Sequence, residues 1–356
     1  MTMNKVRKIF FSGGGSGGHV MPALTLIDFL KKHNPEIEIH YIGDSKGIEY
    51  ELVNSRGVAF HSIHTGKLRR YFSLQNFIDF FKVILGIFEA FFTLLSHPQS
   101  IVFCTGGFVT VPVVIAAFLQ GKKVYIHEQT SRVGLANKIS SYFATRVFIS
   151  FEESHQYFPE NKTSFTGYPI REEFFNDTSE TSESLSTSFQ FADASKPLLF
   201  VTGGGNGSQL INENIKENLD SLKKDFNIVH QVGKNFEKEY SEFNDGSYYS
   251  AGFFDKEIID LLKCSKVIVS RSGAGTVMEL MALGKRSVLI PLAIAQKNEQ
   301  YYNALEAKEK MGSLLIEEKN LTSEKLFSSI KLLNEESRDT KVANTEATSK
   351  IIKEIL

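Results

Sequence analysis

A glycine-rich segment that could bind phosphate lies near the start of the chain. Gly13, Gly15 and Gly18 are spaced as in a dinucleotide-binding loop, and His19 follows them directly. Glycines let backbone amides approach a ligand closely, and a helix N-terminus carries roughly half a positive charge. Taken alone this spacing is a weak signal, and it also fits a tight strand-to-helix turn that binds nothing.

A related segment, residues 200–209, occurs far downstream. Both segments combine an apolar run, a glycine turn and the start of a helix, but only the first ends in histidine. This repetition indicates two sheet-and-helix domains with a phosphate-bearing ligand between them.

His19 could act as a general base, because the positive end of the predicted helix favours neutral imidazole, which can accept a proton. Alternatively, it only caps the turn. His19 stands where a Walker loop requires lysine, so the segment is not a Walker loop. Asp44, near the end of the second predicted strand, could serve as the ribose-binding acid of an NAD site.

A third glycine-bearing helix start spans residues 270–279. Its amides and hydroxyls could bind a phosphate, and Glu279 could accept two hydrogen bonds from a ribose. Alternatively, Glu279 only complements the helix dipole, a contribution of roughly 0.3–1 kcal/mol. Gln300 and Asn303 are spaced to share one helix face, where they could reach a sugar or a phosphate or remain surface polar residues.

Short apolar strands alternate with helices around these segments, which is typical of parallel, doubly wound α/β sheets. Ligands of such sheets bind beyond the carboxyl ends of the strands. The stretch from residue 176 to 195 is dense in Ser, Thr, Glu and Asp and is interpreted as a solvated linker or loop. The predicted strands are 8–12, 38–42, 100–104 and 123–127 in the first series and 197–201, 226–231, 266–270 and 286–290 in the second.

Composition sets the class of protein. A chain of 356 residues is long enough for two domains, and 42% hydrophobic and 23% charged residues are typical of a soluble globular protein. The net charge of -1 gives no indication of nucleic-acid binding. Cys104 and Cys264 lie in apolar runs and are expected to be reduced thiols. The first residues lack the apolar core of a signal peptide, so we expect a cytoplasmic protein.

The sequence contains no Asp-x-Asp motif. Enzymes that hold nucleotide diphosphates through a metal usually cluster carboxylates for Mg²⁺ or Mn²⁺. We therefore expect no metal and no cofactor, with glycine-loop amides, helix ends and Arg171 stabilising the leaving phosphate.

Residues 77–95 form the most apolar stretch, which is long enough to raise the question of a membrane span. Asp79, Lys82 and Glu89 argue against a span and fall in one stripe roughly 80–100° wide, which leaves more apolar surface than packing on a sheet requires. Each basic residue adds about 1 kcal/mol of attraction to an anionic membrane. We expect interfacial docking, with a buried helix or a dimer interface as alternatives. The residues expected at the membrane are Lys67, Arg69, Arg70, Phe77, Phe80, Phe81, Ile84 and Phe88.

An ordered set of short motifs resembles that of the MurG family, the UDP-N-acetylglucosamine transferases that make lipid II from lipid I in bacterial cell-wall synthesis. They cover most of the chain, and as an ordered set they are highly specific. The matching segments are 13–19, 66–71, 106–109, 127–129, 134–138, 167–171, 272–279 and 300–304.

The resemblance implies a GT-B fold of two Rossmann-like domains facing a central cleft. It implies an acceptor- and membrane-binding domain at 1–170, a linker at 171–195, a UDP-sugar-binding domain at 196–338 and a final helix at 339–356 that returns to the first domain. It also implies UDP-N-acetylglucosamine, lipid I and an anionic membrane surface as partners, without nucleic acid. The oligomeric state is left open.

The resemblance further implies roles for single residues. His19 matches a proposed base, with Glu128 as the alternate, and Arg171 is expected to contact the donor phosphates. Phe254 is expected near the uracil. The other implied substrate-binding residues are Ser16, Gly17, Gly18, Thr130, Asn137, Gly205, Ala274, Gly275, Thr276, Val277, Met278, Glu279, Gln300 and Asn303.

Three departures from the family pattern affect substrate contacts. Gly205 stands where the family usually has Ser, and Thr130 stands where it often has Asn. Residues 296–299 lack the Asp or His that is common there.

The resulting hypothesis is an inverting, metal-independent transfer of N-acetylglucosamine to the 4-hydroxyl of the muramyl sugar of lipid I. The alternatives are another GT-B enzyme, such as a lipid glycosyltransferase or a UDP-sugar epimerase, an NAD-dependent oxidoreductase, and an inactive membrane scaffold.

Overall fold

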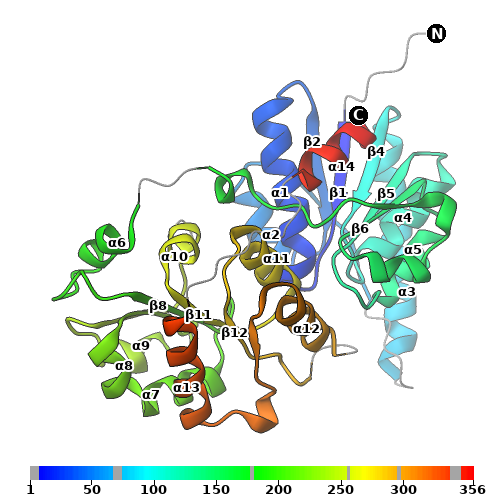
Figure 1. The fold of residues 1–356 in the computed structure, drawn as a ribbon. Coiled ribbons are helices and arrows are strands. Elements are labelled where there is room, and N and C mark those ends of the chain that lie inside the picture. Colours follow the sequence, from blue (N-terminus) through cyan, green and yellow to red (C-terminus); the bar gives the residue numbers. More distant parts are fainter. Residues whose placement is uncertain (1–7, 67–73, 177–179, 255–256, 295–297, 337–345) are drawn as a thin grey trace. The chain divides into compact units, whose positions relative to one another are not determined.

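The computed structural model describes residues 8–66, 74–176, 180–254, 257–294, 298–336 and 346–356. The chain divides into two compact units, Met1–Arg171 with Asn344–Leu356 and Glu172–Ala343. Each unit is built on one parallel sheet, so the predicted pair of doubly wound α/β domains is confirmed (Figure 1). The basic residues Lys67, Arg69 and Arg70 lie outside the described part of the chain.

The first unit contains a seven-stranded sheet in the order β3-β2-β1-β4-β5-β6-β7. Its strands are β1 (Lys8–Ser12), β2 (Glu38–Gly43), β3 (Ala59–Ser62), β4 (Ser100–Cys104), β5 (Val124–Glu128), β6 (Arg146–Ile149) and β7 (Thr163–Phe165). Its α-helices are α1 (Gly17–His33), α2 (Ile48–Asn54), α3 (Leu74–Leu95), α4 (Thr110–Leu119), α5 (Leu135–Ser141) and α14 (Ala347–Ile355).

Alternate residues of each strand point to opposite faces of this sheet and build two separate cores. Ile9 and Phe11 belong to the core that α1 and α14 cover. Phe10 and Val102 belong to the core beneath α3 and α4.

The second unit contains a six-stranded sheet in the order β10-β9-β8-β11-β12-β13. Its strands are β8 (Leu198–Thr202), β9 (Asn227–Gln231), β10 (Tyr248–Ala251), β11 (Val267–Ser270), β12 (Val288–Leu289) and β13 (Leu314–Leu315). Its α-helices are α6 (Ser182–Ser188), α7 (Gln209–Glu217), α8 (Leu219–Asp225), α9 (Glu237–Ser241), α10 (Ile258–Cys264), α11 (Ala274–Leu283), α12 (Glu299–Met311) and α13 (Ser323–Glu335).

Helix α6 lies inside the polar stretch interpreted from the sequence as a solvated linker. Thr181 and Ser184 form a capping box at its start, which satisfies two backbone N–H groups in a stretch of low hydrophobicity. Leu185 and Phe191 are both buried. Burial of Leu185 and Phe191, together with the capping box, accounts for a helix in this polar stretch.

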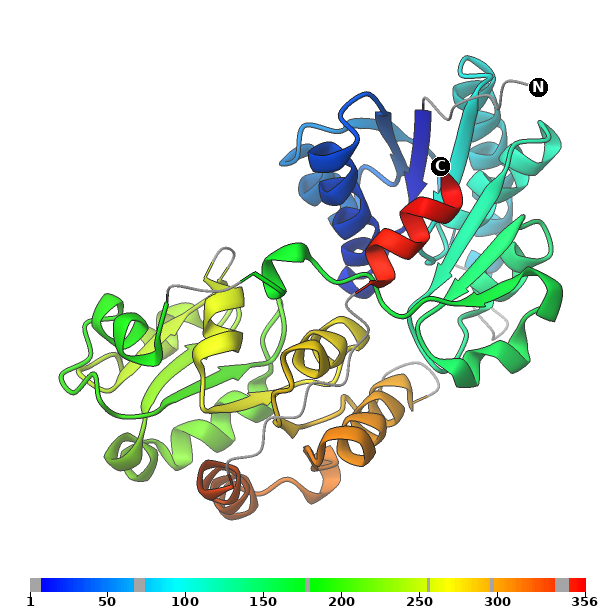
Figure 2. The ribbon, with the colours of Figure 1, turned by 45° about the horizontal axis from the view of Figure 1, so that its top comes forward.

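The last helix of the chain packs in the first unit. Ile351, Ile352 and Ile355 of α14 enter the same core as Leu24 and Ile27 of α1. Figure 2 shows α14 in red lying across this unit.

Among the residues that the structure describes, no helix combines the length and the hydropathy needed to cross a membrane.

Candidate functional site

Two glycine loops meet at the carboxyl ends of β1 and β4 in the first unit. Gly14 donates its N–H to the carbonyl of Gly106 at 3.1 Å. A Cβ atom on Gly13 would lie 2.0 Å from Thr105 Oγ1, and one on Gly107 would lie 2.0 Å from the Gly14 oxygen. These glycines are therefore required for the two loops to pack against each other.

Gly17 and Gly18, in the first turn of α1, are different. No described heavy atom lies within 4 Å of a Cβ built on Gly17, and only Ser16 Oγ, at 3.9 Å, lies near one on Gly18. Neither residue has a positive φ. Glycine within a helix costs roughly 0.5–1 kcal/mol relative to alanine. Because packing does not require glycine here, the open main chain is suited to the close approach of a ligand.

The first turn of α1 also keeps free donors. Ser16 occupies the N-cap position, but its side chain caps no backbone N–H of the helix. Its Oγ lies 3.0 Å from Nδ1 of His19 instead. The N–H of His19 donates to the Ser16 carbonyl at 3.1 Å, which leaves the N–H groups of Gly17 and Gly18 at this helix start to bind an anion.

His19 is half-buried at this helix start. Burial lowers its pKa from the ordinary value, and a hydrogen bond with the backbone of Gly14 partly opposes that shift. The imidazole is therefore neutral near pH 7 and can accept a proton. A Cβ on Gly106 would lie 3.0 Å from His19 Cδ2 and 3.1 Å from Asn137 Nδ2. Gly106 thus lets His19 and Asn137 approach the same point.

Glu128, at the end of β5, is buried, and both of its carboxylate oxygens accept hydrogen bonds. Its Oε1 accepts hydrogen bonds from the N–H and the hydroxyl of Thr130, at 3.0 and 2.8 Å, and its Oε2 accepts one from Asn137 Nδ2 at 3.0 Å. Burial raises its pKa, while these hydrogen bonds act in the opposite direction. The geometry brings together Glu128, Thr130 and Asn137, with the carboxylate holding the other two in place.

Glu49 was not singled out by any sequence pattern, yet it contacts the first glycine loop. Its Oε2 accepts the N–H of Gly15 and its Oε1 accepts the N–H of Asp44, both at 3.3 Å. A Cβ on Gly14 would lie 2.3 Å from Glu49 Oε1. A carboxylate of the chain itself already takes one of the amides that a dinucleotide pyrophosphate would use, which argues against the NAD alternative.

The matching loop of the second unit is built differently. Ser208 caps α7 through its own side chain, which accepts the N–H of Ile211 at 3.4 Å. Arg271 donates to the same Oγ at 2.8 Å and forms a 2.7 Å ion pair with Glu318. Gly205 is exposed, with only Phe253 Cε2, at 3.9 Å, near an added Cβ. The protein itself thus satisfies part of this helix start.

Helix α11 offers an open start in the second unit. Gly273 is its N-cap and supplies no side-chain hydrogen bond, so the first-turn N–H groups of residues 274–276 stay available. Ala274, Val277 and Met278 are buried, whereas Gly275, Thr276 and Glu279 are partly exposed. A ligand at this helix start would therefore meet main chain, the Thr276 hydroxyl and the Glu279 carboxylate.

Gln300 and Asn303 hold the loop before α11 in place. Asn303 is buried and donates to the carbonyl of Ser272 at 3.1 Å, while the Ser272 hydroxyl donates to the Gln300 carbonyl at 2.8 Å. Gln300 Oε1 accepts the N–H of Leu292 at 3.0 Å. Gln300 and Asn303 thus contact the segments around Ser272 and Leu292 of the protein itself.

Phe254 and Arg171 complete the expected substrate-binding residues. The Phe254 ring is buried with Phe200 and Tyr249 close by, and its N–H donates to Gln231 Oε1 at 3.0 Å. Arg171 is half-buried and is the last residue of the first unit before the chain enters the second.

Helix α3 presents its apolar side outward. Of the polar stripe predicted from the sequence, Asp79 is buried, Glu89 Oε1 lies 2.7 Å from His64 Nδ1, and Lys82 is exposed. Gly86, on the same helix, is also buried. The backbone packs closely here on both segments. A Cβ on Gly66 would lie 2.3 Å from the backbone oxygen of Asp79, and one on Gly86 would lie 2.1 Å from the backbone oxygen of His64. Ile84 is only partly exposed. The exposed apolar residues of the helix are Phe77, Ile78, Phe80, Phe81, Leu85, Phe88, Phe92 and Leu95.

Comparison with known proteins gives matches over nearly the full chain. Residues 9–149 match the glycosyltransferase family 28 N-terminal domain, and residues 198–355 match its C-terminal domain. A relative from Clostridium perfringens (strain ATCC 13124) is 40% identical over 348 residues, covering 98% of this chain and 95% of that protein. One from Clostridium tetani is 41% identical over 323 residues, covering 90% and 88%. Both are named UDP-N-acetylglucosamine--N-acetylmuramyl-(pentapeptide) pyrophosphoryl-undecaprenol N-acetylglucosamine transferase.

The fold also matches a solved structure. The crystal structure of Acinetobacter baumannii MurG superposes with a TM-score of 0.69 at 21% identity, covering 98% of this chain and 99% of that chain.

Proposed function

We infer that this chain, which belongs to glycosyltransferase family 28, transfers N-acetylglucosamine from UDP-N-acetylglucosamine to lipid I and so forms lipid II. The observation that carries this conclusion is the 40% identity over 98% of the chain to relatives that bear the transferase name. The reaction belongs to peptidoglycan synthesis, and through it to cell shape and division.

For the chemical step, we propose that the 4-hydroxyl of the muramyl sugar attacks the anomeric carbon from the face opposite UDP. The new bond joins that oxygen to the anomeric carbon, and the bond from the anomeric carbon to the diphosphate oxygen breaks. The hydroxyl proton passes to the His19 imidazole, and the electron pair leaves with UDP. The neutral imidazole expected from the lowered pKa of His19 supports this role.

Stabilisation of the leaving diphosphate is assigned to main-chain N–H groups and Arg171. The uncapped start of α1 supplies the N–H groups of Gly17 and Gly18, which no helical carbonyl accepts. Gly17 and Gly18 support this assignment most strongly, because packing does not require glycine at either position. We assign no metal to this step.

Glu279 is proposed to bind the ribose of the donor, and Thr276 its phosphates. Both are partly exposed, Thr276 in the first turn of α11 and Glu279 in the second. Thr130 and Asn137 are proposed to contact the acceptor, held in position by Glu128.

We further propose that α3 docks the enzyme on the cytoplasmic face of the cell membrane. Asp79 of α3 is buried while Phe77, Phe80, Phe81, Phe88 and Phe92 are exposed, and full burial of one such side chain in lipid is favourable by roughly 1.5–3 kcal/mol. Such docking would bring the enzyme to a lipid-linked acceptor.

The decisive experiment incubates the enzyme with UDP-N-acetylglucosamine and a lipid I analogue, with and without EDTA. We expect a lipid II analogue of inverted anomeric configuration in both conditions. Activity that is lost in EDTA and restored by Mg²⁺ or Mn²⁺ would contradict the metal-free mechanism. Turnover of the nucleotide sugar without any acceptor would instead indicate an epimerase.

A further inference from the structure

Three histidines gather around Phe10 on the sheet face beneath α3. His40 comes from β2, His61 from β3 and His97 from the loop after α3. The Phe10 ring stacks on His40 at a centroid distance of 4.5 Å and lies 5.6 Å from His61 and 5.0 Å from His97. Segments that are distant in the sequence thus meet at one point.

This cluster lies apart from the glycine loops. Lys8 pairs with Glu38 and with Ser100 in the sheet, so the cluster sits near the amino ends of β1, β2 and β4. The loops of the candidate site follow the carboxyl ends of the same strands. The cluster is not used by the proposed transfer.

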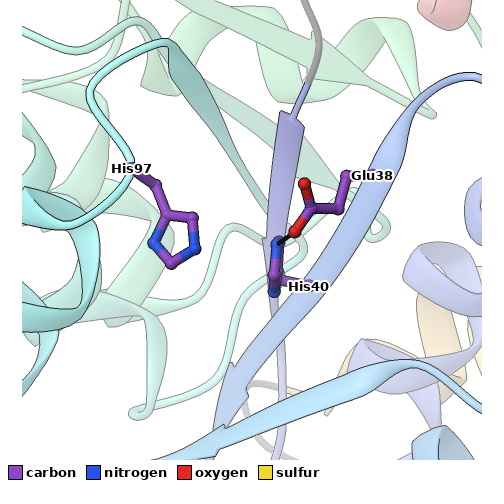
Figure 3. Close-up of side chains that lie close together, drawn as sticks. All are labelled: Glu38, His40 and His97. Carbon is purple, nitrogen blue, oxygen red and sulfur yellow. Dashed lines mark hydrogen bonds and ion pairs between the residues drawn. The ribbon is translucent and has the colours of Figure 1, made fainter.

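Glu38, His40 and His97 each offer a ligand atom, and these atoms lie within 4.8 Å of one another. Figure 3 shows the His40 ring bonded to the Glu38 carboxylate, with the His97 ring beside them. In a tetrahedral site with bonds of 2.0–2.1 Å, ligand atoms are about 3.3 Å apart. Glu38 Oε1 and His40 Nε2 are already 2.8 Å apart, so binding would require this pair to open slightly, which the half-exposed Glu38 side chain permits.

The hydrogen-bond partners of the two imidazoles decide which ring nitrogens can coordinate an ion. His97 Nδ1 lies 3.0 Å from the carbonyl of Thr93, which can only accept, so Nδ1 carries the proton and Nε2 keeps a lone pair. His40 Nε2 lies 2.8 Å from Glu38 Oε1, and its Nδ1 lies 3.1 Å from His61 Nε2. Because a carboxylate only accepts, His40 Nε2 carries the proton in this structure and donates it to Glu38. Binding of an ion at Nε2 would displace that proton, and with Nδ1 protonated His61 Nε2 can accept the Nδ1 hydrogen bond.

We propose that Glu38, His40 and His97 bind one divalent transition-metal ion of the zinc class, with water at the remaining position. Two imidazoles and one carboxylate form a donor set that suits Zn²⁺. The ion would tie β2 to the end of α3 and stabilise the first unit.

Lys8 opposes this binding. Its ammonium lies 2.7 Å from Glu38 Oε2, next to the place of the ion. Replacing it with a neutral side chain removes a like-charge repulsion. The variant Lys8→Met should therefore bind the metal more tightly than the wild type.

The test is calorimetric titration of the full-length, tag-free protein with Zn²⁺. We expect one saturable site per chain, which raises the melting temperature and weakens as the pH falls, because the imidazoles must be neutral. His97→Ala and Glu38→Gln should each weaken binding about tenfold or more. Co²⁺ in place of Zn²⁺ should give the visible absorption of a four-coordinate site, which His97→Ala abolishes.

The matched control is His64→Ala. His64 and Glu89 form a similar pair in the same unit, at 2.7 Å, and they belong to no three-residue ligand cluster within the described residues. This variant should bind Zn²⁺ like the wild type. The proposal is overturned if no saturable binding occurs, if His97→Ala and Glu38→Gln bind as the wild type does, or if His64→Ala is the variant that loses the ion.

Discussion

The carboxylate of Glu49 lies beneath the main chain of Gly15, and its Oε2 accepts the Gly15 N–H at 3.3 Å. Its other oxygen accepts the N–H of Asp44. One buried side chain thus fixes the first glycine loop to the turn after β2. The loop that positions His19 depends on this buried carboxyl group for its shape.

Glu49→Gln should loosen that loop. An amide has one acceptor oxygen, so one of the two backbone N–H groups loses its partner, at a cost of about 1–3 kcal/mol in the free energy of unfolding. Urea unfolding measures this change, and Glu51→Gln, an exposed position on the same helix, is the control. Equal stability of the two variants would contradict the role of Glu49.

The pH dependence of stability gives a second readout for Glu49. Burial raises the pKa of the native carboxyl above the ordinary value of 4.5. The native state therefore holds this proton more tightly than the unfolded state, and the stability contribution of the residue falls as pH rises through the native pKa. Unfolding measured from pH 4 upward should show this fall in the wild type and lack it in Glu49→Gln.

His19→Gln should lose turnover while keeping donor affinity. Removal of a general base typically lowers the rate by about 10²–10⁴-fold. In the wild type, the rate should fall as pH drops through the pKa of His19, which lies below the ordinary 6.5. The variant should lack that acid limb. Turnover at the wild-type level would remove His19 from the mechanism.

Gly17→Ala separates ligand approach from folding. Because the position is helical and open, alanine should raise the stability by roughly 0.5–1 kcal/mol. Catalysis should fall by about 10²-fold, since the methyl group displaces the reacting groups. Gly13→Ala, which places a Cβ 2.0 Å from Thr105 Oγ1, should instead destabilise the fold. A fully active Gly17→Ala enzyme would show that no ligand approaches there.

Glu279→Ala should weaken the binding of UDP. Loss of hydrogen bonds to a charged group corresponds to about 1.5–3 kcal/mol, which is roughly tenfold or more in Kd. Glu324→Ala, a first-turn acid on α13, tests the contribution of the helix dipole alone. If both variants lose only a little stability and neither loses affinity, Glu279 has no ribose contact.

Membrane docking depends on the phenylalanines of α3. The double variant Phe77→Ser with Phe81→Ser should bind vesicles of anionic phospholipid about 10²-fold more weakly, because two large apolar side chains no longer enter the lipid. Leu332→Ser, at an exposed position in the second unit, is the control. Co-sedimentation with the vesicles measures the difference, and equal binding of both variants would exclude α3 as the docking surface.

The regular elements of the fold could be predicted because strands buried on both faces read as apolar runs. The predicted strand 8–12 coincides with β1, and 38–42 falls short of β2 by one residue. Edge strands gave no comparable signal: β3 is partly exposed and β13 has two residues. Their positions are set by pairing in the sheet rather than by local pattern.

The candidate site could be predicted only where a local motif marks it. Gly17, Gly18 and His19 stand in such a motif, and the structure gives them an open helix start. Glu49 could not be found this way, because it acts from a separate helix on a loop that the fold brings to it. The same holds for His40 and His97, which meet only when β2 lies beside β1 and the α3 loop covers them.

The position of α14 has a consequence for synthesis of the chain. Ile351, Ile352 and Ile355 complete a hydrophobic core whose other members all lie within the first 150 residues. During synthesis, the first unit therefore cannot complete this core until α14 has left the ribosome. The second unit, residues 172–343, can fold around its own sheet before that. A nonsense codon that removes only about the last dozen residues would therefore leave the first unit without α14.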